Sequence, residues 1–532
     1  MTRRPNILMV VMDCARSDRW HGPGKTAHTP VFDRLAREGA SLPTTITETA
    51  CTTPCFACLL SGAYSVRHGI AGVGGYTLAD DMLSLAQVLR SAGYNTYAEV
   101  TGPLVEMAGL TRGFDEYNYR LAFDYMHTEW GASFIKRLSG GGFRAPWFVL
   151  LHLWELHVER QVTPDCDHEQ FGENRYDRAV SSLDRQLGRI LEAMPSDTLV
   201  ILTGDHGEKT TDEQYRPGTA VGRARKLYEV GRSSSLGVRG AAMMIGPVAM
   251  QQLRAHFQPR LESFSQAQTP RNLHSGRLQA WVDFLRLARL APWLRPWDFG
   301  ALRSSARRLR MLEQRGVLDT DRNRRAVGRL VRRVGEEKLF DLYLRMWASQ
   351  FRKQLDEGHV LHVYDFLTRV PLILHGTSGL TRGFQSERMV RQIDIAPSVL
   401  DLLEIERPEG FSPDGRSFAP LLHGKAWEAA RAFQSVSAQP RDLTLRGIRT
   451  ERERFTYGPI DENVPSELYD LTTDPAEQSN IASEHAARCD ELRGAAESFV
   501  PSGGPRVCRA ENLSTEQQRQ IELRLRELGY VE

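Results

Sequence analysis

Residues 199–207 read Leu199-Val200-Ile201-Leu202-Thr203-Gly204-Asp205-His206-Gly207. A short apolar run that ends at a glycine is typical of a buried strand in a parallel sheet. Asp205 and His206 follow directly, at the carboxyl end of the predicted strand. Ligands of open α/β sheets bind outside that edge, and a carboxylate beside an imidazole offers two donors to one cation. The stretch therefore predicts both a parallel sheet and a metal-binding edge.

The N-terminal residues repeat this pattern. Asn6–Met12 is an apolar run that we interpret as a second buried strand, and it ends on Asp13. Carboxyl ends of parallel strands meet at one edge of a sheet. We therefore expect Asp13 to lie beside Asp205 and His206, as the third ligand of one divalent cation.

A loop between these two strands supplies a hydroxyl group. Residues 48–54 lead into a predicted short helix that has Pro54 in its first turn and Gly62 at its end. Thr52 is expected at the N-terminus of this helix, where free N–H groups and the helix dipole favour an anion. We predict that Thr52 binds the same cation and attacks a phosphorus or sulfur atom, although a helix N-cap is its simpler role.

Strands and helices alternate along the first part of the chain, which predicts a parallel sheet with helices on both faces. The fold class is therefore α/β, a mostly parallel sheet sandwiched by helices, with a helical insertion and a smaller C-terminal α+β subdomain. The expected helices are 30–39, 82–93, 174–194 and 392–405, and the expected strands are 6–12, 94–100, 147–151, 199–203 and 369–374.

The predicted domains are a first core segment at 1–209, an inserted helical subdomain at 210–358, a second core segment at 359–420 and a C-terminal subdomain at 421–532. Residues 251–358 hold 22 Lys and Arg against 11 Asp and Glu, so they carry +11 in a chain whose net charge is +2. A helical bundle with solvated arginines is the preferred interpretation of the insertion, ahead of a lid over the site. Contact with an anionic membrane surface stays open but is not favoured. We predict no nucleic-acid partner, because no binding motif accompanies the charge.

The cysteines and the absence of long apolar runs predict a cytoplasmic protein. The chain has seven cysteines, an odd number, and several lie close to the predicted site. This usage is typical of reduced thiols in a reducing compartment. No stretch reaches the ~20 apolar residues that span a bilayer. The sequence does not predict an oligomeric state.

Taken in order, these motifs resemble the sulfatases and sulfatase-like hydrolases of the alkaline phosphatase superfamily. The resemblance covers almost the whole chain except the insertion. Its stretches are Pro5–Asp13, Thr29–Ala36, the Thr52 loop with Leu59–Gly62, Arg112–Asp115, Thr203–Glu208, Arg369–Ile373, Ile393–Ser398, Asp414–Ser417 and Glu467–Glu477.

The chain departs from the family at the nucleophile. Sulfatases carry Cys-x-Pro-Ser-Arg, whose cysteine becomes formylglycine. Alignment on Pro54 places Thr52 at that cysteine, Cys55 at the serine and Phe56 at the arginine. Threonine cannot become formylglycine, so the resemblance implies a hydroxyl nucleophile, as in the phosphodiesterase and phosphotransferase branches. The second aspartate of the family's Asp-Asp pair is Cys14 here.

The expected activity is a metal-dependent hydrolase of phosphate mono- or diesters or of sulfate esters, which proceeds through a covalent Thr52 intermediate and binds an anionic ester substrate. We favour phosphate because of the hydroxyl. Two carboxylates and an imidazole suit zinc or manganese better than calcium, although calcium stays open. The alternatives are a phosphotransferase that uses the same intermediate and a catalytically inactive protein that binds an anion or a partner.

A second group of candidates surrounds the predicted strand at 147–151. Glu155 and His157 match an acidic residue two before a histidine in the family, and His359 matches a position that holds His or Lys. We expect His157 and His359 to protonate the leaving group or hold the anion, with Glu155 as a substrate-binding residue; alternatively, Glu155, His157 and His359 hold a second metal ion. For Arg16, bidentate binding of the substrate oxyanion and an ordinary surface position both stay open. For His152 we favour a structural hydrogen-bonding role.

Overall fold

The computed structural model describes residues 4–22, 24–73, 75–157, 160–210, 332, 359, 362–376, 380–437, 444–460 and 464–510. The chain divides into two compact units. One comprises residues 1–214 and 357–531, and the other is centred on residues 215–356. The helices predicted for the insertion lie outside the described residues, except for residue 332.

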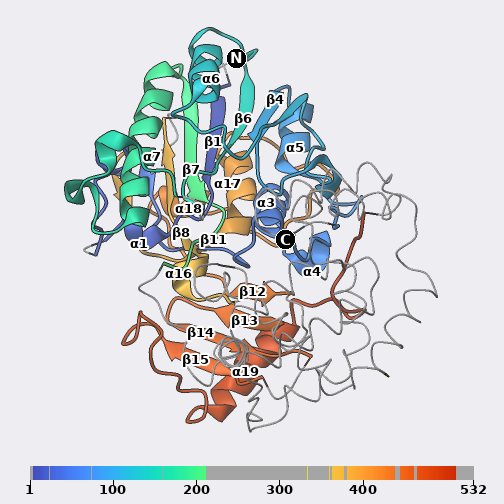
Figure 1. Cartoon of the computed structure of the whole chain (residues 1–532). Coiled ribbons are helices and arrows are strands. Elements are labelled where there is room, and N and C mark those ends of the chain that lie inside the picture. The colour runs from blue at the N-terminus through green and yellow to red at the C-terminus, as the bar shows by residue number, and fades with distance from the viewer. Residues whose placement is uncertain are drawn as a thin grey trace. The chain divides into compact units, whose positions relative to one another are not determined.

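An eight-stranded sheet forms the centre of this unit (Figure 1), in the order β10-β2-β9-β7-β1-β6-β4-β5. β1 lies between β6 and β7 and is parallel to both, and β4 and β5 continue the parallel part. β9 is antiparallel to β7 and β2, so the sheet is mostly parallel, as predicted. The strands are β1 Asn6–Met12, β2 Ala40–Ser41, β4 Asn95–Val100, β5 Glu116–Tyr119, β6 Trp147–Leu153, β7 Thr198–Gly204, β9 Leu372–His375 and β10 Phe384–Gln385.

Helices cover both faces of the sheet, because successive strand residues point to opposite faces. Leu8, Val10 and Met12 of β1 pack with α2 (Pro30–Glu38), α6 (Glu129–Ser139) and α7 (Arg175–Ala193). Ile7, Met9 and Val11 pack with α3 (Thr52–Ser61), α5 (Leu85–Ser91) and α17 (Ile395–Leu402). Every residue of β1 is buried, so truncation of one of these side chains to alanine costs about 2–5 kcal/mol. The predicted α/β sandwich is confirmed.

The helix α3 has clear local start and stop signals. Its N-cap, Cys51, is extended, and its C-cap, Gly62, adopts φ 69°. A Cβ at Gly62 would lie 2.7 Å from Cβ of Pro413, so both the left-handed backbone and the space require glycine. The helix predicted at 82–93 begins later, at Leu85, because Ser84 and Gln87 form a capping box.

An antiparallel sheet follows in the C-terminal part, in the order β12-β13-β14-β15, and α19 (Ala486–Glu497) packs on it. Its strands are β12 Ala432–Val436, β13 Leu445–Arg449, β14 Glu453–Tyr457 and β15 Glu467–Asp470. Cys58 of α3 and Tyr64 contribute to the same apolar cluster as Phe433 and Leu492, which joins this sheet to the helix that carries Thr52.

Shorter elements complete the described fold, including a three-stranded sheet in the order β11-β3-β8. They are α1 Ser17–Trp20, β3 Thr45–Ile46, α4 Ser65–His68, η1 Glu106–Ala108, η2 Pro164–Cys166, η3 Glu169–Phe171, α16 Asp365–Thr368, β8 Arg369–Val370, β11 Val390–Arg391, η4 Gln392–Asp394 and α18 Ala419–Leu422. Within the described ranges no helix combines the length and the apolar composition needed to cross a membrane.

Candidate active site

The two central strands end side by side. β1 and β7 are parallel in the register Met12 with Gly204, so Asp13 and Asp205 follow at the same edge. Both carboxylates are fully buried. The backbone N–H of Cys14 donates to Oδ1 of Asp205 at 3.1 Å, which fixes one strand end to the other.

Thr52 meets this edge from the N-terminus of α3. Its Oγ1 lies 3.2 Å from Oδ2 of Asp13 and 3.2 Å from Nε2 of His206. Nδ1 of His206 lies 2.8 Å from the carbonyl oxygen of Gly207, and we assign the ring N–H to that bond. The lone pair of Nε2 then faces the hydroxyl of Thr52. The structure thus brings together the four residues that the sequence proposes as one cation site.

Two buried carboxylates and a neutral imidazole at this edge leave negative charge that a divalent cation would balance. Burial and the neighbouring Asp13 carboxylate raise the pKa of Asp205 well above its ordinary value. Burial would also raise the pKa of Asp13, but the hydrogen bond with His152 and the nearby imidazoles lower it. Burial lowers the pKa of His206 to about 3, so its ring is neutral, as a metal ligand requires. Oδ2 of Asp205 has no hydrogen-bond partner among the described residues.

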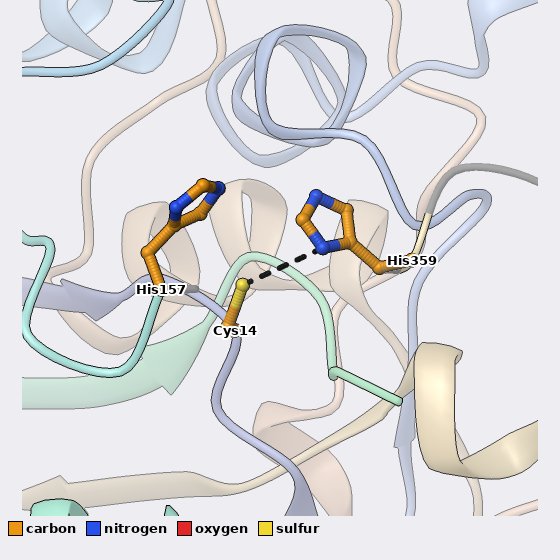
Figure 2. Close-up of side chains that lie close together, drawn as sticks. All are labelled: Cys14, His157 and His359. Carbon is orange, nitrogen blue, oxygen red and sulfur yellow. Dashed lines mark hydrogen bonds between the residues drawn. The ribbon is translucent and has the colours of Figure 1, made fainter. Parts of the chain in front are cut away.

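A second group of side chains adjoins the first through Cys14, whose Sγ lies 2.9 Å from Oδ1 of Asp13. Figure 2 shows Cys14, His157 and His359 close together, and Sγ of Cys14 lies 3.8 Å from Nδ1 of His359. The same Nδ1 lies 3.2 Å from Oε2 of Glu208. Burial disfavours charge on both His359 and Glu208, but the electrostatic attraction and hydrogen bond between them outweigh burial. This pairing raises the pKa of His359 and lowers the pKa of Glu208 to about 2.

Two predicted substrate-binding residues have other contacts. Glu155 accepts a hydrogen bond from the backbone N–H of Met126 at 2.8 Å, so one of its oxygens fixes a neighbouring loop. The guanidinium of Arg16 donates to both carboxylate oxygens of Asp18 and to the carbonyl oxygen of Glu208. The guanidinium of Arg16 is therefore bound by Asp18 beside the segment that follows His206. Its contact with an anion stays a prediction.

Sequence reasoning missed two side chains near this edge and gave a third, His152, only a structural role. Glu208 appeared only as part of a motif, and Cys14 only as a departure from the family. Nε2 of His152 donates to Oδ2 of Asp13 at 3.1 Å, because the pKa of Asp13 is lowered and its carboxylate is ionised. This fits the expected hydrogen-bonding role of His152 but places it against a proposed ligand. A polar residue inside an apolar strand was the available signal for His152, since burying it requires a partner.

Another buried polar cluster contacts α3 through the side chain of Cys58. Glu48 accepts hydrogen bonds from Cys58, Ser65 and Ser435. Nδ1 of His68 accepts from the backbone N–H of Ile70 at 3.2 Å, and its Nε2 lies 3.5 Å from Sγ of Cys58. Because protein donors already engage the carboxylate, we interpret this cluster as structural.

Two family models match the chain. The Sulfatase model matches residues 5–231, and the model of the C-terminal region of N-sulphoglucosamine sulphohydrolase matches residues 360–493. The first includes Asp13, Thr52, Asp205 and His206, the four residues expected around one cation, and the second includes the antiparallel C-terminal sheet.

Curated relatives match over most of the chain. An N-acetylglucosamine-6-O-sulfatase of Bacteroides thetaiotaomicron is 23% identical, with 92% of this chain and 85% of the relative covered. A multifunctional alkaline phosphatase superfamily protein of Trinickia caryophylli is also 23% identical, with 91% and 92% covered.

Among solved structures, the phosphonate monoester hydrolase of Agrobacterium radiobacter superposes with a TM-score of 0.54 at 16% identity, covering 93% of this chain and 95% of that one. This likeness shows the shared fold. The two family models together match most of the chain, and with the curated relatives they show that it belongs to the sulfatase family, a family of ester hydrolases.

Proposed function

We propose that this protein hydrolyses phosphate mono- or diesters or sulfate esters with a divalent metal ion, and that Oγ1 of Thr52 is the nucleophile. The observation that carries the proposal is the position of this hydroxyl, 3.2 Å from both Asp13 and His206 at the start of α3. A weak nucleophile can be activated by a metal ion that its oxygen contacts. Asp13 and His206 are two of the proposed ligands of that ion, so the Thr52 hydroxyl lies where a bound cation would activate it.

The neighbouring cysteine is a poorer nucleophile. Burial, together with the Asp205 and Asp13 carboxylates, raises the pKa of Cys51 to about 12. Its thiol therefore stays protonated near neutral pH, and the thiolate is the reactive form of cysteine. This contrast favours Thr52 within the loop.

The residues that would hold the metal ion are Asp13, Thr52, Asp205 and His206. Two buried carboxylates, a neutral imidazole and a hydroxyl form a mixed oxygen and nitrogen donor set that suits zinc or manganese. When bound, a divalent cation would lower the pKa of the Thr52 hydroxyl and neutralise charge on the transferring group.

The remaining steps are assigned to the chain's own residues. Thr52 attacks the phosphorus or sulfur atom, its proton goes to solvent and the bond to the leaving oxygen breaks. Water then cleaves the Thr52 ester, which restores the hydroxyl and releases the acid product. His359 carries a proton through its pairing with Glu208, and its Nε2 has no partner among the described residues. We assign His359 to protonation of the leaving oxygen and His157, beside it, to binding of the anion.

The test is an ester panel with a matched pair of variants. Protein loaded with zinc, manganese or calcium is offered para-nitrophenyl phosphate, bis(para-nitrophenyl) phosphate and para-nitrophenyl sulfate. Thr52→Val removes the hydroxyl at nearly constant volume and is expected to lower kcat by about 10⁴-fold or more. Thr53→Val makes the same change one residue later and should retain activity, because within the described part of the chain Oγ1 of Thr53 makes one long contact, 3.5 Å to the carbonyl oxygen of Pro103.

The outcomes separate the alternatives. Turnover of the sulfate ester alone refutes the preference for phosphate, and equal activity of Thr52→Val and wild type refutes the nucleophile. Transfer of the group to an added alcohol at the expense of hydrolysis indicates a phosphotransferase. No turnover together with no bound metal indicates an inactive binding protein.

A further inference from the structure

The stretch Glu467–Glu477 resembles the family, but the proposed reaction gives it no role. Its two end residues are glutamates, Glu467 at the start of β15 and Glu477 ten residues later. Both are buried. A buried carboxylate needs hydrogen-bond donors or cations around it, so the contacts of these two side chains indicate what the stretch does.

The carboxylate of Glu467 binds two parts of the chain. The hydroxyl of Tyr364 donates to its Oε2 at 2.9 Å, and the hydroxyl of Tyr469, in β15 itself, donates to the same atom at 3.0 Å. Nε2 of His362 lies 3.3 Å from its Oε1. Burial would raise the pKa of Glu467, but His362 and Arg454 lower it to about 2. The carboxylate is therefore ionised and accepts from these donors.

The carboxylate of Glu477 binds the next residues of the same segment. Its Oε2 accepts from the backbone N–H of Asp365 at 2.9 Å, and its Oε1 accepts from the guanidinium of Arg454 in β14. The carboxylate of Asp365 in turn accepts from Nε and Nη2 of Arg449 in β13, both at 2.9 Å. Residues 362–365 are thus tied to the C-terminal sheet by both glutamates and by Arg449.

The segment held in this way adjoins the candidate active site. It begins three residues after His359, whose Nδ1 lies 3.2 Å from Oε2 of Glu208. Further along, the carbonyl oxygen of Leu367 accepts from the backbone N–H of Gly207 at 2.7 Å, directly after His206. A shift of the segment therefore changes where His359 lies relative to Glu208.

We propose that Glu467 and Glu477 are positioning residues that hold residues 362–365 and, through them, place His359 against Glu208. The consequence for catalysis rests on the proposed function, in which His359 protonates the leaving oxygen. A misplacement of about 1 Å can cost about 10²-fold in rate. The C-terminal sheet therefore acts on the reaction through one short segment of the core.

Two tyrosine variants test this inference with the same chemical change. Tyr364→Phe and Tyr469→Phe each remove one donor from Oε2 of Glu467, but only Tyr364 lies in the segment that follows His359. A merely structural role predicts similar effects of the two variants. Positioning predicts that kcat on phenyl phosphate or phenyl sulfate falls by about 10-fold in Tyr364→Phe alone, with KM unchanged. The loss should be smaller on the matching para-nitrophenyl ester, whose better leaving group depends less on an acid.

Proton NMR of the full chain reports the position of His359 without turnover. The proton that Nδ1 of His359 shares with Glu208 should give a resonance downfield of the amide signals, assigned by its loss in His359→Gln. This resonance should be lost or shifted in Tyr364→Phe and in Glu467→Gln, and unchanged in Tyr469→Phe. If Glu467→Gln does not fold, the two tyrosine variants decide alone.

The outcomes separate this inference from the proposed function. Wild-type kcat in His359→Gln, together with the expected NMR pattern, refutes the acid role of His359 and supports its positioning. A resonance that is unchanged in Tyr364→Phe, or changed equally in both tyrosine variants, overturns the positioning inference. Absence of the resonance from wild type also overturns it, because His359 is then not held against Glu208.

Discussion

Removal of the Glu48 carboxylate tests how α3 is held in place. Glu48 is 2% exposed. It accepts from the backbone N–H of Ser65 at 2.7 Å, from the hydroxyl of Ser435 at 2.7 Å, from Sγ of Cys58 at 3.2 Å and from the hydroxyl of Ser65. These contacts join the helix that carries Thr52 to α4 and to β12. We expect Glu48→Ala to be strongly destabilising.

The magnitude follows from the donors left behind. Each buried donor without an acceptor costs about 1–3 kcal/mol. The Ser65 and Ser435 hydroxyls lie 3.5 Å apart and can partly satisfy each other, so the Ser65 N–H and the Cys58 thiol are the main losses. Relief of the buried carboxylate, whose pKa burial raises, offsets part of this. We expect Glu48→Ala to lower the free energy of unfolding by about 3 kcal/mol and Glu48→Gln, which retains one acceptor oxygen, by about 2 kcal/mol.

Urea unfolding followed by circular dichroism measures both variants. Glu406→Ala is the matched control, because Glu406 is exposed and should shift stability by less than about 0.5 kcal/mol. A Glu48→Ala protein within experimental error of this control would refute the inference that the carboxylate anchors the helix. The inference would be supported if Glu48→Ala is the most destabilised variant, Glu48→Gln is less destabilised and Glu406→Ala is the least.

The remaining predictions concern backbone space, pH and metal removal. A Cβ at Gly207 would lie 2.2 Å from the carbonyl oxygen of Phe366, so Gly207→Ala should displace the neighbouring His206 and weaken zinc binding measured by calorimetry. Gly494→Ala is the control, because a Cβ there meets no described atom within 4 Å. It should raise the free energy of unfolding by about 0.5–1 kcal/mol. Burial lowers the pKa of His21 and of His68 to about 3, so the unfolded chain takes up protons first as pH falls below about 6.5. Stability should then fall by about 1.4 kcal/mol per pH unit for each histidine between pH 6.5 and 3, and a urea midpoint that is unchanged from pH 7 to pH 5 would contradict this. Chelation should lower the unfolding temperature and added zinc should restore it, because a ligand of the folded state stabilises that state; an unchanged temperature would show that no metal is bound.

Local sequence patterns predicted the strands and helices whose boundary signals lie within a few residues. The apolar runs that end at Asp13 and Asp205 are β1 and β7, and Pro54 near the start and Gly62 just after the end mark α3. The direction of a strand has no local signal, because an apolar run reads alike in both directions. The antiparallel course of β9 therefore appears only when its partners are known.

The candidate site was predictable to the same extent. Residues directly after a strand share its edge, so Asp13, Asp205 and His206 could be grouped from sequence. The position of Glu208 depends on how the chain turns after His206, which spacing does not encode. Glu155 shows the converse: its spacing from His157 matched a pattern, but its carboxylate reaches the backbone of Met126.

The identity of residue 52 also decides whether the proposed nucleophile needs a covalent modification after translation. A threonine hydroxyl is complete when translation ends, whereas a formylglycine aldehyde must be installed by a separate maturation enzyme. On the proposed mechanism, recombinant protein from a host without that enzyme needs only folding and metal uptake. Its specific activity should then be independent of any maturation partner supplied alongside it.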